Sequence, residues 1–194
     1  MSRATDFANS LDEIDEIFEV EDEDSFLPED YKVPTEEKYM KLKIGDNRFR
    51  ILSSPIVGYI FWIEEKDDKG KLTRKPVRLR MNELQSRAKE APRRDEIKHF
   101  WAMVVYNYDS ENISILEITQ RSIQNTIKSL QSDPDWGSPK KYDLLITRTG
   151  EGLDTHYTVT PKPSSKIDDK ITEKYNSMHI NLEALFEGGD PYEY

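Results

Sequence analysis

Hydrophobic and polar residues alternate through the middle of the chain with the period of two that is typical of β-strands. Phe49 and Ile51 alternate with Arg48 and Arg50, and the alternation resumes further along, so residues 47–63 are predicted to form one long strand or two collinear strands. This segment contains a Ser-Ser-Pro sequence and a glycine, and we expect it to bend at both.

Two hairpins and a helix are predicted after this segment. Residues 99–108 are rich in aromatic and β-branched residues, and a polar turn joins them to residues 113–118, their expected hairpin partner. Thr119 is the expected N-cap of a helix whose apolar residues lie at helical spacing and which an Asp-Pro sequence ends. Residues 142–149 and 155–160 flank a glycine-containing turn and are predicted to form the second hairpin.

The order of these elements predicts a mainly β fold, a five-stranded OB-fold barrel with one helix between strands 3 and 4. Residues 64–97 are then a basic insertion between strands 1 and 2. Within it we expect a turn at residues 67–70, a short strand at 75–81, and a short helix that Asn82 caps and Pro92 ends. In OB folds the loops between strands 1 and 2 and between strands 4 and 5 flank the ligand groove, so the insertion should lie beside that groove.

Charge is distributed unevenly along the chain, whose net charge is −10. Residues 1–40 contain 14 acidic and 3 basic residues, for a net charge of −11, and residues 164–194 have a net charge of −4. Residues 41–163 have a net charge of +5, and residues 66–94 within them contain 11 basic and 4 acidic residues. The acidic ends therefore conceal a basic centre, and net charge alone does not exclude a nucleic-acid partner.

Composition and charge together predict three parts. Residues 1–37 are an acidic N-terminal arm, partly helical or disordered, with apolar residues at helical spacing between residues 11 and 18. Residues 38–163 are the OB-fold domain. Residues 164–194 are a linker and an acidic C-terminal tail that includes a short helix, and both termini are expected to be flexible.

Several classes of function are excluded or disfavoured by composition. The chain has no cysteine, and its three histidines are far apart, so we expect no metal and no cofactor. Asp154 and His156 lie close in sequence, but no nucleophile accompanies them, so we expect no enzyme. No apolar run is long enough to span a membrane and no secretory signal is present, which indicates a cytoplasmic protein.

Binding single-stranded DNA without sequence preference requires cations for the phosphates and exposed aromatic rings for the bases. Both types of residue occur together in the predicted barrel and its insertion. Each has a structural alternative, because alternating arginines usually form a solvated face and strand aromatics usually pack in a core. The candidate DNA-binding residues are Arg48, Arg50, Tyr59, Trp62, Arg74, Lys75, Arg78, Arg80, Lys98, Trp101, Arg148 and Tyr157.

Over residues 38–163 the chain resembles the OB-fold single-stranded DNA-binding proteins encoded by bacteriophages. The resemblance rests on an ordered series of motifs: NRFRIL at 47–52, GYIFW at 58–62, KPVR at 75–78, FWA at 100–102, VYNY at 105–108, LEIT at 116–119, DWG at 135–137, YD at 142–143 and RTGEGLDTHY at 148–157.

This resemblance implies a protein that coats single-stranded DNA during phage replication, recombination and repair in the host cytoplasm, with self-association along the strand a further possibility. It also implies an acidic C-terminal tail that recruits a polymerase, helicase or primase. The candidate tail residues are Asp190, Tyr192, Glu193 and Tyr194. Either acidic end could occupy the basic groove when DNA is absent.

Two other functions remain open from the sequence. The barrel could be the scaffold of an acidic protein-interaction or adaptor module, or the protein could bind single-stranded RNA, because stacking on aromatic rings does not distinguish the two sugars.

Overall fold

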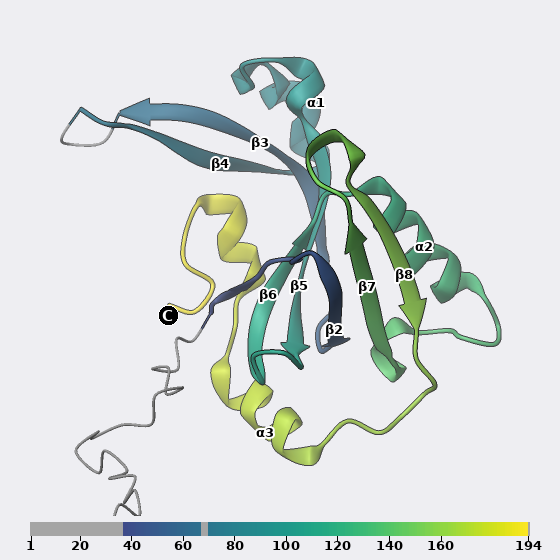
Figure 1. The fold of residues 1–194 in the computed structure, drawn as a ribbon. Helices are drawn as coiled ribbons and strands as arrows, with labels where there is room; N and C mark the ends of the chain where they lie inside the picture. Colours follow the sequence, from purple (N-terminus) through teal and green to yellow (C-terminus); the bar gives the residue numbers. More distant parts are fainter. Residues whose placement is uncertain (1–36, 67–69, 194) are drawn as a thin grey trace, which may run out of the picture. The chain divides into compact units, whose positions relative to one another are not determined.

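The computed structural model describes residues 37–66 and 70–193, which form the mainly β fold drawn in Figure 1. The expected N-terminal arm, apart from its last residue, lies outside the described residues, and so do the first three residues of the expected turn at 67–70. None of the described helices is long and apolar enough to cross a membrane.

The described strands belong to one sheet of eight strands. Its main path runs β1–β6–β5–β2–β7–β8, and β3 joins this path by pairing with both β5 and β4. The pairing of β1 with β6 is parallel and the others are antiparallel. The strands are β1 (Tyr39–Met40), β2 (Gly45–Ile51), β3 (Ile56–Lys66), β4 (Leu72–Arg80), β5 (Lys98–Asn107), β6 (Asn112–Ile118), β7 (Asp143–Thr149) and β8 (His156–Pro161).

The predicted long strand is present as two collinear strands, because β2 pairs with the C-terminal part of β5 and β3 with its N-terminal part. Between them, the backbone N–H of Leu52 donates to the carbonyl of Val104, and the hydroxyl of Ser53 accepts from the Val104 N–H. Further along β3, a Cβ at Gly58 would lie 2.3 Å from the carbonyl oxygen of Leu79 in β4. Glycine is therefore required where these two strands approach each other.

Both predicted hairpins, β5–β6 and β7–β8, are confirmed, but the described strands do not close into a five-stranded barrel. Closure would require β6 to pair with β8. Instead β1 lies along β6, with Tyr39 opposite Ile115 and Met40 opposite Leu116, and the Ile115 N–H donates to the carbonyl of Lys38. This short parallel strand occupies the edge of β6 that closure would need.

The predicted helix is α2 (Arg121–Ser132), and it covers one face of the sheet (Figure 1). Ile123 and Ile127 are buried against β2, β5, β6 and β7, each contributing about 1.5–3 kcal/mol by burial. Asp133 ends the helix as expected, but the predicted N-cap is wrong by one residue. Gln120 holds that position, and its side-chain oxygen accepts from the Thr119 N–H.

The insertion forms a hairpin and short helical turns. Its predicted strand is confirmed as part of β4, which pairs along β3 from Leu72 to Arg80. The turns that follow are η1 (Met81–Glu83), α1 (Leu84–Arg87), η2 (Ala88–Glu90) and η3 (Arg94–Glu96). Asn82 is not their cap: the Arg80 N–H donates to the Glu83 carboxylate, because Glu83 lies one turn further on and can reach back.

The C-terminal segment packs on the sheet, which differs from the expected flexible tail. Helix α3 (Asp169–Met178) and the 3₁₀ turn η6 (Leu182–Glu187) form this segment. Leu182 and Leu185 are buried against residues of β3, β5 and β6, on the opposite face of the sheet from α2. The apolar residues of η6, although few, are enough to bind an otherwise acidic segment to the fold. Two further turns are η4 (Pro139–Lys141) and η5 (Gly152–Asp154).

Candidate nucleic-acid interface

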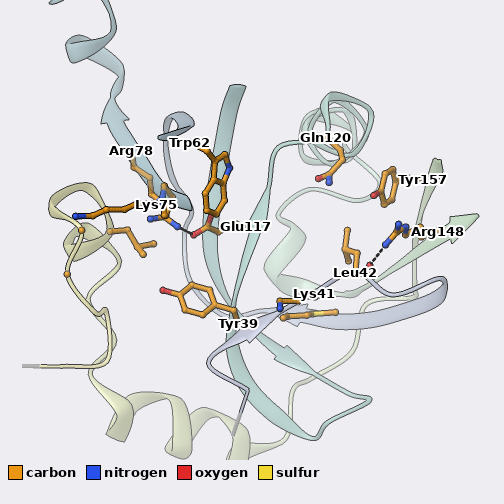
Figure 2. A pocket seen from close by; sticks show the side chains of 15 residues that line it. Tyr39, Lys41, Leu42, Trp62, Lys75, Arg78, Glu117, Gln120, Arg148 and Tyr157 are labelled. Carbon is orange, nitrogen blue, oxygen red and sulfur yellow. Dashed lines mark hydrogen bonds and ion pairs between the residues drawn. The ribbon is translucent and has the colours of Figure 1, made fainter. Parts of the chain in front are cut away.

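A cleft of about 630 Å³ lies between the β3–β4 hairpin, the β7–β8 hairpin and the C-terminal end of β6 (Figure 2). Residues 39–42, in and after β1, line one part of it, and residues 185, 188 and 189 of the C-terminal segment line another. Five of the predicted DNA-binding residues meet here although up to 95 positions separate them in the chain: Trp62, Lys75, Arg78, Arg148 and Tyr157.

Two aromatic side chains from different hairpins lie on opposite sides of this cleft. Trp62 comes from β3 and Tyr157 from β8, and Figure 2 shows the cleft between them. Trp62 is 44% exposed, more than is usual for a tryptophan. The guanidinium of Arg74 lies 5.9 Å from the centre of the Trp62 ring. Trp62 is therefore the more accessible of the two rings, whereas Tyr157 is half-buried and packs partly against the core.

The cations that line the cleft are held in different ways. Arg78 forms an ion pair with Glu117, and these side chains are only 10% and 20% exposed. Lys75 and Glu65 form an exposed pair at 3.5 Å. Arg148 donates from Nη1 to the carbonyl of Leu42 at 3.0 Å, so its charge meets no carboxylate there.

Two guanidinium groups at the cleft have a buried N–H that lacks a partner. The Nε atoms of Arg78 and Arg148 are buried and form no hydrogen bond within the part of the chain that the structure describes. A buried donor without an acceptor costs about 1–3 kcal/mol. Because these Nε atoms are buried, an anion in the cleft would have to bind the other nitrogens of the two guanidinium groups.

Several residues of the cleft escaped the sequence analysis, among them Lys41, Glu117 and Gln120. Lys41 is exposed and follows β1, a strand too short to produce a periodic pattern. Glu117 interrupts an otherwise buried run in β6, and this interruption is the signal that could have revealed it. Gln120 is in the lining at the point where β6 leads into α2.

Arg50 was predicted to contact DNA, and the structure contradicts that prediction. The residue is 2% exposed, forms an ion pair with Asp143, and donates to the carbonyl and the hydroxyl of Ser165. Its polar pattern on β2 arises because it reaches a buried carboxylate and not solvent. Arg48 also bonds Asp143, through Nε at 3.0 Å and Nη2 at 2.6 Å, but its side chain is half-exposed and lies over the ring of Tyr108.

Asp143 is the centre of this buried network. Burial by itself would raise the pKa of its carboxyl, but hydrogen bonds from Arg48, Arg50 and Tyr108 outweigh it and lower the pKa below its usual value. Asp143 is therefore ionised when the protein is folded, and its charge compensates that of Arg50.

The remaining predicted residues lie outside the main cleft. Tyr59 makes an edge-on contact with the ring of His99, and Arg80 pairs with Glu183 and Glu187 of the C-terminal segment. Trp101 packs against the core beneath α2 and lines a separate cleft of about 340 Å³. Lys98 lines a third cleft beside α2.

The predicted tail residues are attached to the body of the protein. Asp190 forms an ion pair with Lys38, and the Tyr192 hydroxyl donates to the carbonyl of Lys38 at 2.7 Å. Glu193 is exposed, and Tyr194 lies outside the described residues. The acidic segment thus borders the cleft through residues 185, 188 and 189 but fixes its charged groups elsewhere.

Comparison with other proteins finds no family model, curated protein or solved structure that matches the chain. Among residues 37–66 and 70–193, no group of three or more His, Asp or Glu side chains could hold a metal ion.

Proposed function

We propose that the protein binds single-stranded DNA, without strong sequence preference, in the cleft between Trp62 and Tyr157. The observation that carries the proposal is the convergence in one cleft of an exposed tryptophan, a half-buried tyrosine and several cations from hairpins far apart in the sequence. Stacking on such rings requires unpaired bases, which favours a single strand over a duplex.

The fold class that we propose with this function is an OB fold that a short parallel strand leaves open. In support, β2 and β3 act together as the first strand, and β5, β6, α2, β7 and β8 follow in the expected order. The cleft lies between the β3–β4 and β7–β8 hairpins, which occupy the places of the two loops that flank the ligand in OB folds. We extend the resemblance to propose that the protein coats DNA during phage replication and recombination and recruits replication proteins through its C-terminal end.

Trp62→Ala tests the proposal. A stacked base contributes about 1–3 kcal/mol, so the variant should bind labelled oligo-dT about 5-fold to about 150-fold more weakly in a fluorescence anisotropy titration. Leu72→Ala is the matched control, because Leu72 is an exposed apolar residue on the paired strand β4 but does not line the cleft. Equal affinity of the Trp62→Ala variant and the native protein would refute the assignment of the cleft.

The same titration separates the alternatives. Matched oligo-dT, oligo-U and duplex DNA are added as competitors at two salt concentrations. Stronger competition by oligo-U than by oligo-dT would identify single-stranded RNA, and not DNA, as the preferred ligand. Absence of binding to every oligonucleotide at moderate salt would favour the adaptor function.

A further inference from the structure

The third cleft, of about 390 Å³, lies at the junction of β5, β6 and α2 and differs from the main cleft in its charge. It is lined by Lys98 and Arg121, with polar Thr119, Gln120 and Gln124 between them, and no acidic residue is among its described lining residues. The main cleft, by contrast, contains Glu117. The third cleft therefore offers an anion two cations with no carboxylate among the residues beside them.

Its two cations have no ion-pair partner among the described residues. Lys98 and Arg121 are both exposed, and neither forms an ion pair or hydrogen bond with a side chain within the described part of the chain. Most cations predicted to bind DNA differ in this respect, since Arg78 and Arg80, for example, are already paired with carboxylates. An incoming phosphate would meet Lys98 and Arg121 without having to displace a partner.

The main cleft and the third cleft are neighbours, because Gln120 lines both. Lys98 also lies opposite Ile60 in the pairing of β3 with β5, two residues before Trp62. A strand stacked on Trp62 can thus leave the main cleft past Gln120 and continue towards Lys98 and Arg121.

We propose that the cleft formed by Lys98, Gln120 and Arg121 binds phosphates of the DNA strand where the strand leaves the Trp62–Tyr157 cleft. This inference rests on the proposed function and specifies the path of the strand. It predicts that the full binding site is longer than the main cleft.

Lys98→Ala combined with Arg121→Ala tests the path with oligo-dT of increasing length, from about 4 to about 16 nucleotides, the range of site sizes found for OB folds. Both residues are exposed, so the variant should fold. Short oligonucleotides that fill only the main cleft should bind the variant and the native protein equally. Longer ones should bind the variant more weakly.

Salt dependence supplies the magnitude. Each phosphate contact to a single strand contributes about 0.7 to the slope of log affinity against log salt, so the double variant should lose about 1.4 from that slope on long oligonucleotides. Between about 50 mM and about 200 mM salt, the ratio of native to variant affinity should then fall about sevenfold. Lys89→Ala combined with Lys128→Ala is the control, because these exposed cations line neither cleft.

The outcomes separate this inference from the proposed function. An unchanged slope on long oligonucleotides would overturn the path while leaving the main cleft as the binding site. An equal loss of affinity for the shortest and the longest oligonucleotides would also overturn the path, because the third cleft would then not extend the main cleft. If the native protein binds no oligonucleotide, both the path and the proposed function fail.

Discussion

Replacing Asp143 with asparagine should destabilise the fold strongly and leave the proposed DNA-binding cleft unchanged. The substitution keeps the size and shape of the side chain but removes the charge that faces Arg50. The Arg50 side chain is 3% exposed, and after the substitution its acceptors would all be neutral, namely the carbonyl and hydroxyl of Ser165 and the new amide oxygen. It would become a buried cation without a counterion.

The magnitude follows from the burial of the pair. Removing one partner of a buried ion pair costs about 3–5 kcal/mol. The pair with Arg48 adds at most about 1 kcal/mol, because that guanidinium is half-exposed and water screens it. For a protein of this size 1 kcal/mol corresponds to about 2–4 °C in Tm, so a total of about 3–6 kcal/mol should lower Tm by roughly 6–24 °C.

Urea denaturation at pH 7, monitored by tryptophan fluorescence, gives the free energy of unfolding directly. Asp95→Asn is the matched control, since Asp95 also bonds an arginine, Arg93, but both side chains are about two-thirds exposed. The control should lose no more than about 1 kcal/mol. A loss below about 1 kcal/mol in the Asp143→Asn variant, or weaker DNA binding under conditions in which the variant is folded, would refute the structural role of the Arg50 pair.

Three further predictions concern the same fold. Because folding lowers the pKa of Asp143, its contribution to stability is complete above about pH 4, the usual pKa of an unfolded aspartate, and is lost as the pH falls through the folded pKa. Urea titrations between pH 2 and pH 7 should show this loss of stability in the native protein and not in the Asp143→Asn variant. Gly58→Ala should lower the free energy of unfolding in urea by about 1–3 kcal/mol, because the added Cβ would overlap the carbonyl of Leu79. An unchanged free energy would contradict the close approach of β3 and β4. Leu185→Ala should lower the free energy of unfolding in urea by about 2–5 kcal/mol, whereas a C-terminal tail that did not pack on the sheet would leave it unchanged.

The local elements of the fold were predictable because local pattern determines them. The period-two alternation, the turn residues and the Asp-Pro sequence gave the strands, both hairpins and the end of α2. The strand β1 was missed because two residues carry no periodicity, and its pairing with β6 depends on contacts between segments about 75 positions apart. The C-terminal segment was misjudged because its charge dominates its composition, while Leu182 and Leu185 supply the burial that holds it.

The site was predictable in its aromatic residues and less so in its cations. Trp62 and Tyr157 were selected as aromatic residues beside polar ones on the expected strands 47–63 and 155–160, and the fold places both in the cleft. Arg50 was selected by the same alternation, but alternation shows only that a side chain leaves one face of a strand. It does not show whether the side chain is exposed to solvent or, like Arg50, pairs with a buried carboxylate.

Counting basic residues in the sequence overstates the number of cations that are free to contact phosphates in the proposed complex with DNA. Eight of the predicted DNA-binding residues are cations, and the structure pairs five of them with carboxylates: Arg48, Arg50, Lys75, Arg78 and Arg80. The other three, with Lys41 and Arg121 added from the clefts, make five cations for phosphate. At about 0.7 per contact, these five imply a salt slope of about 3.5, and the nine that would be free if Arg48, Lys75, Arg78 and Arg80 left their carboxylates imply about 6.3. A slope near the higher value would mean that the ion pairs open when DNA binds, so that carboxylates such as Glu117 hold the arginines only until phosphate replaces them.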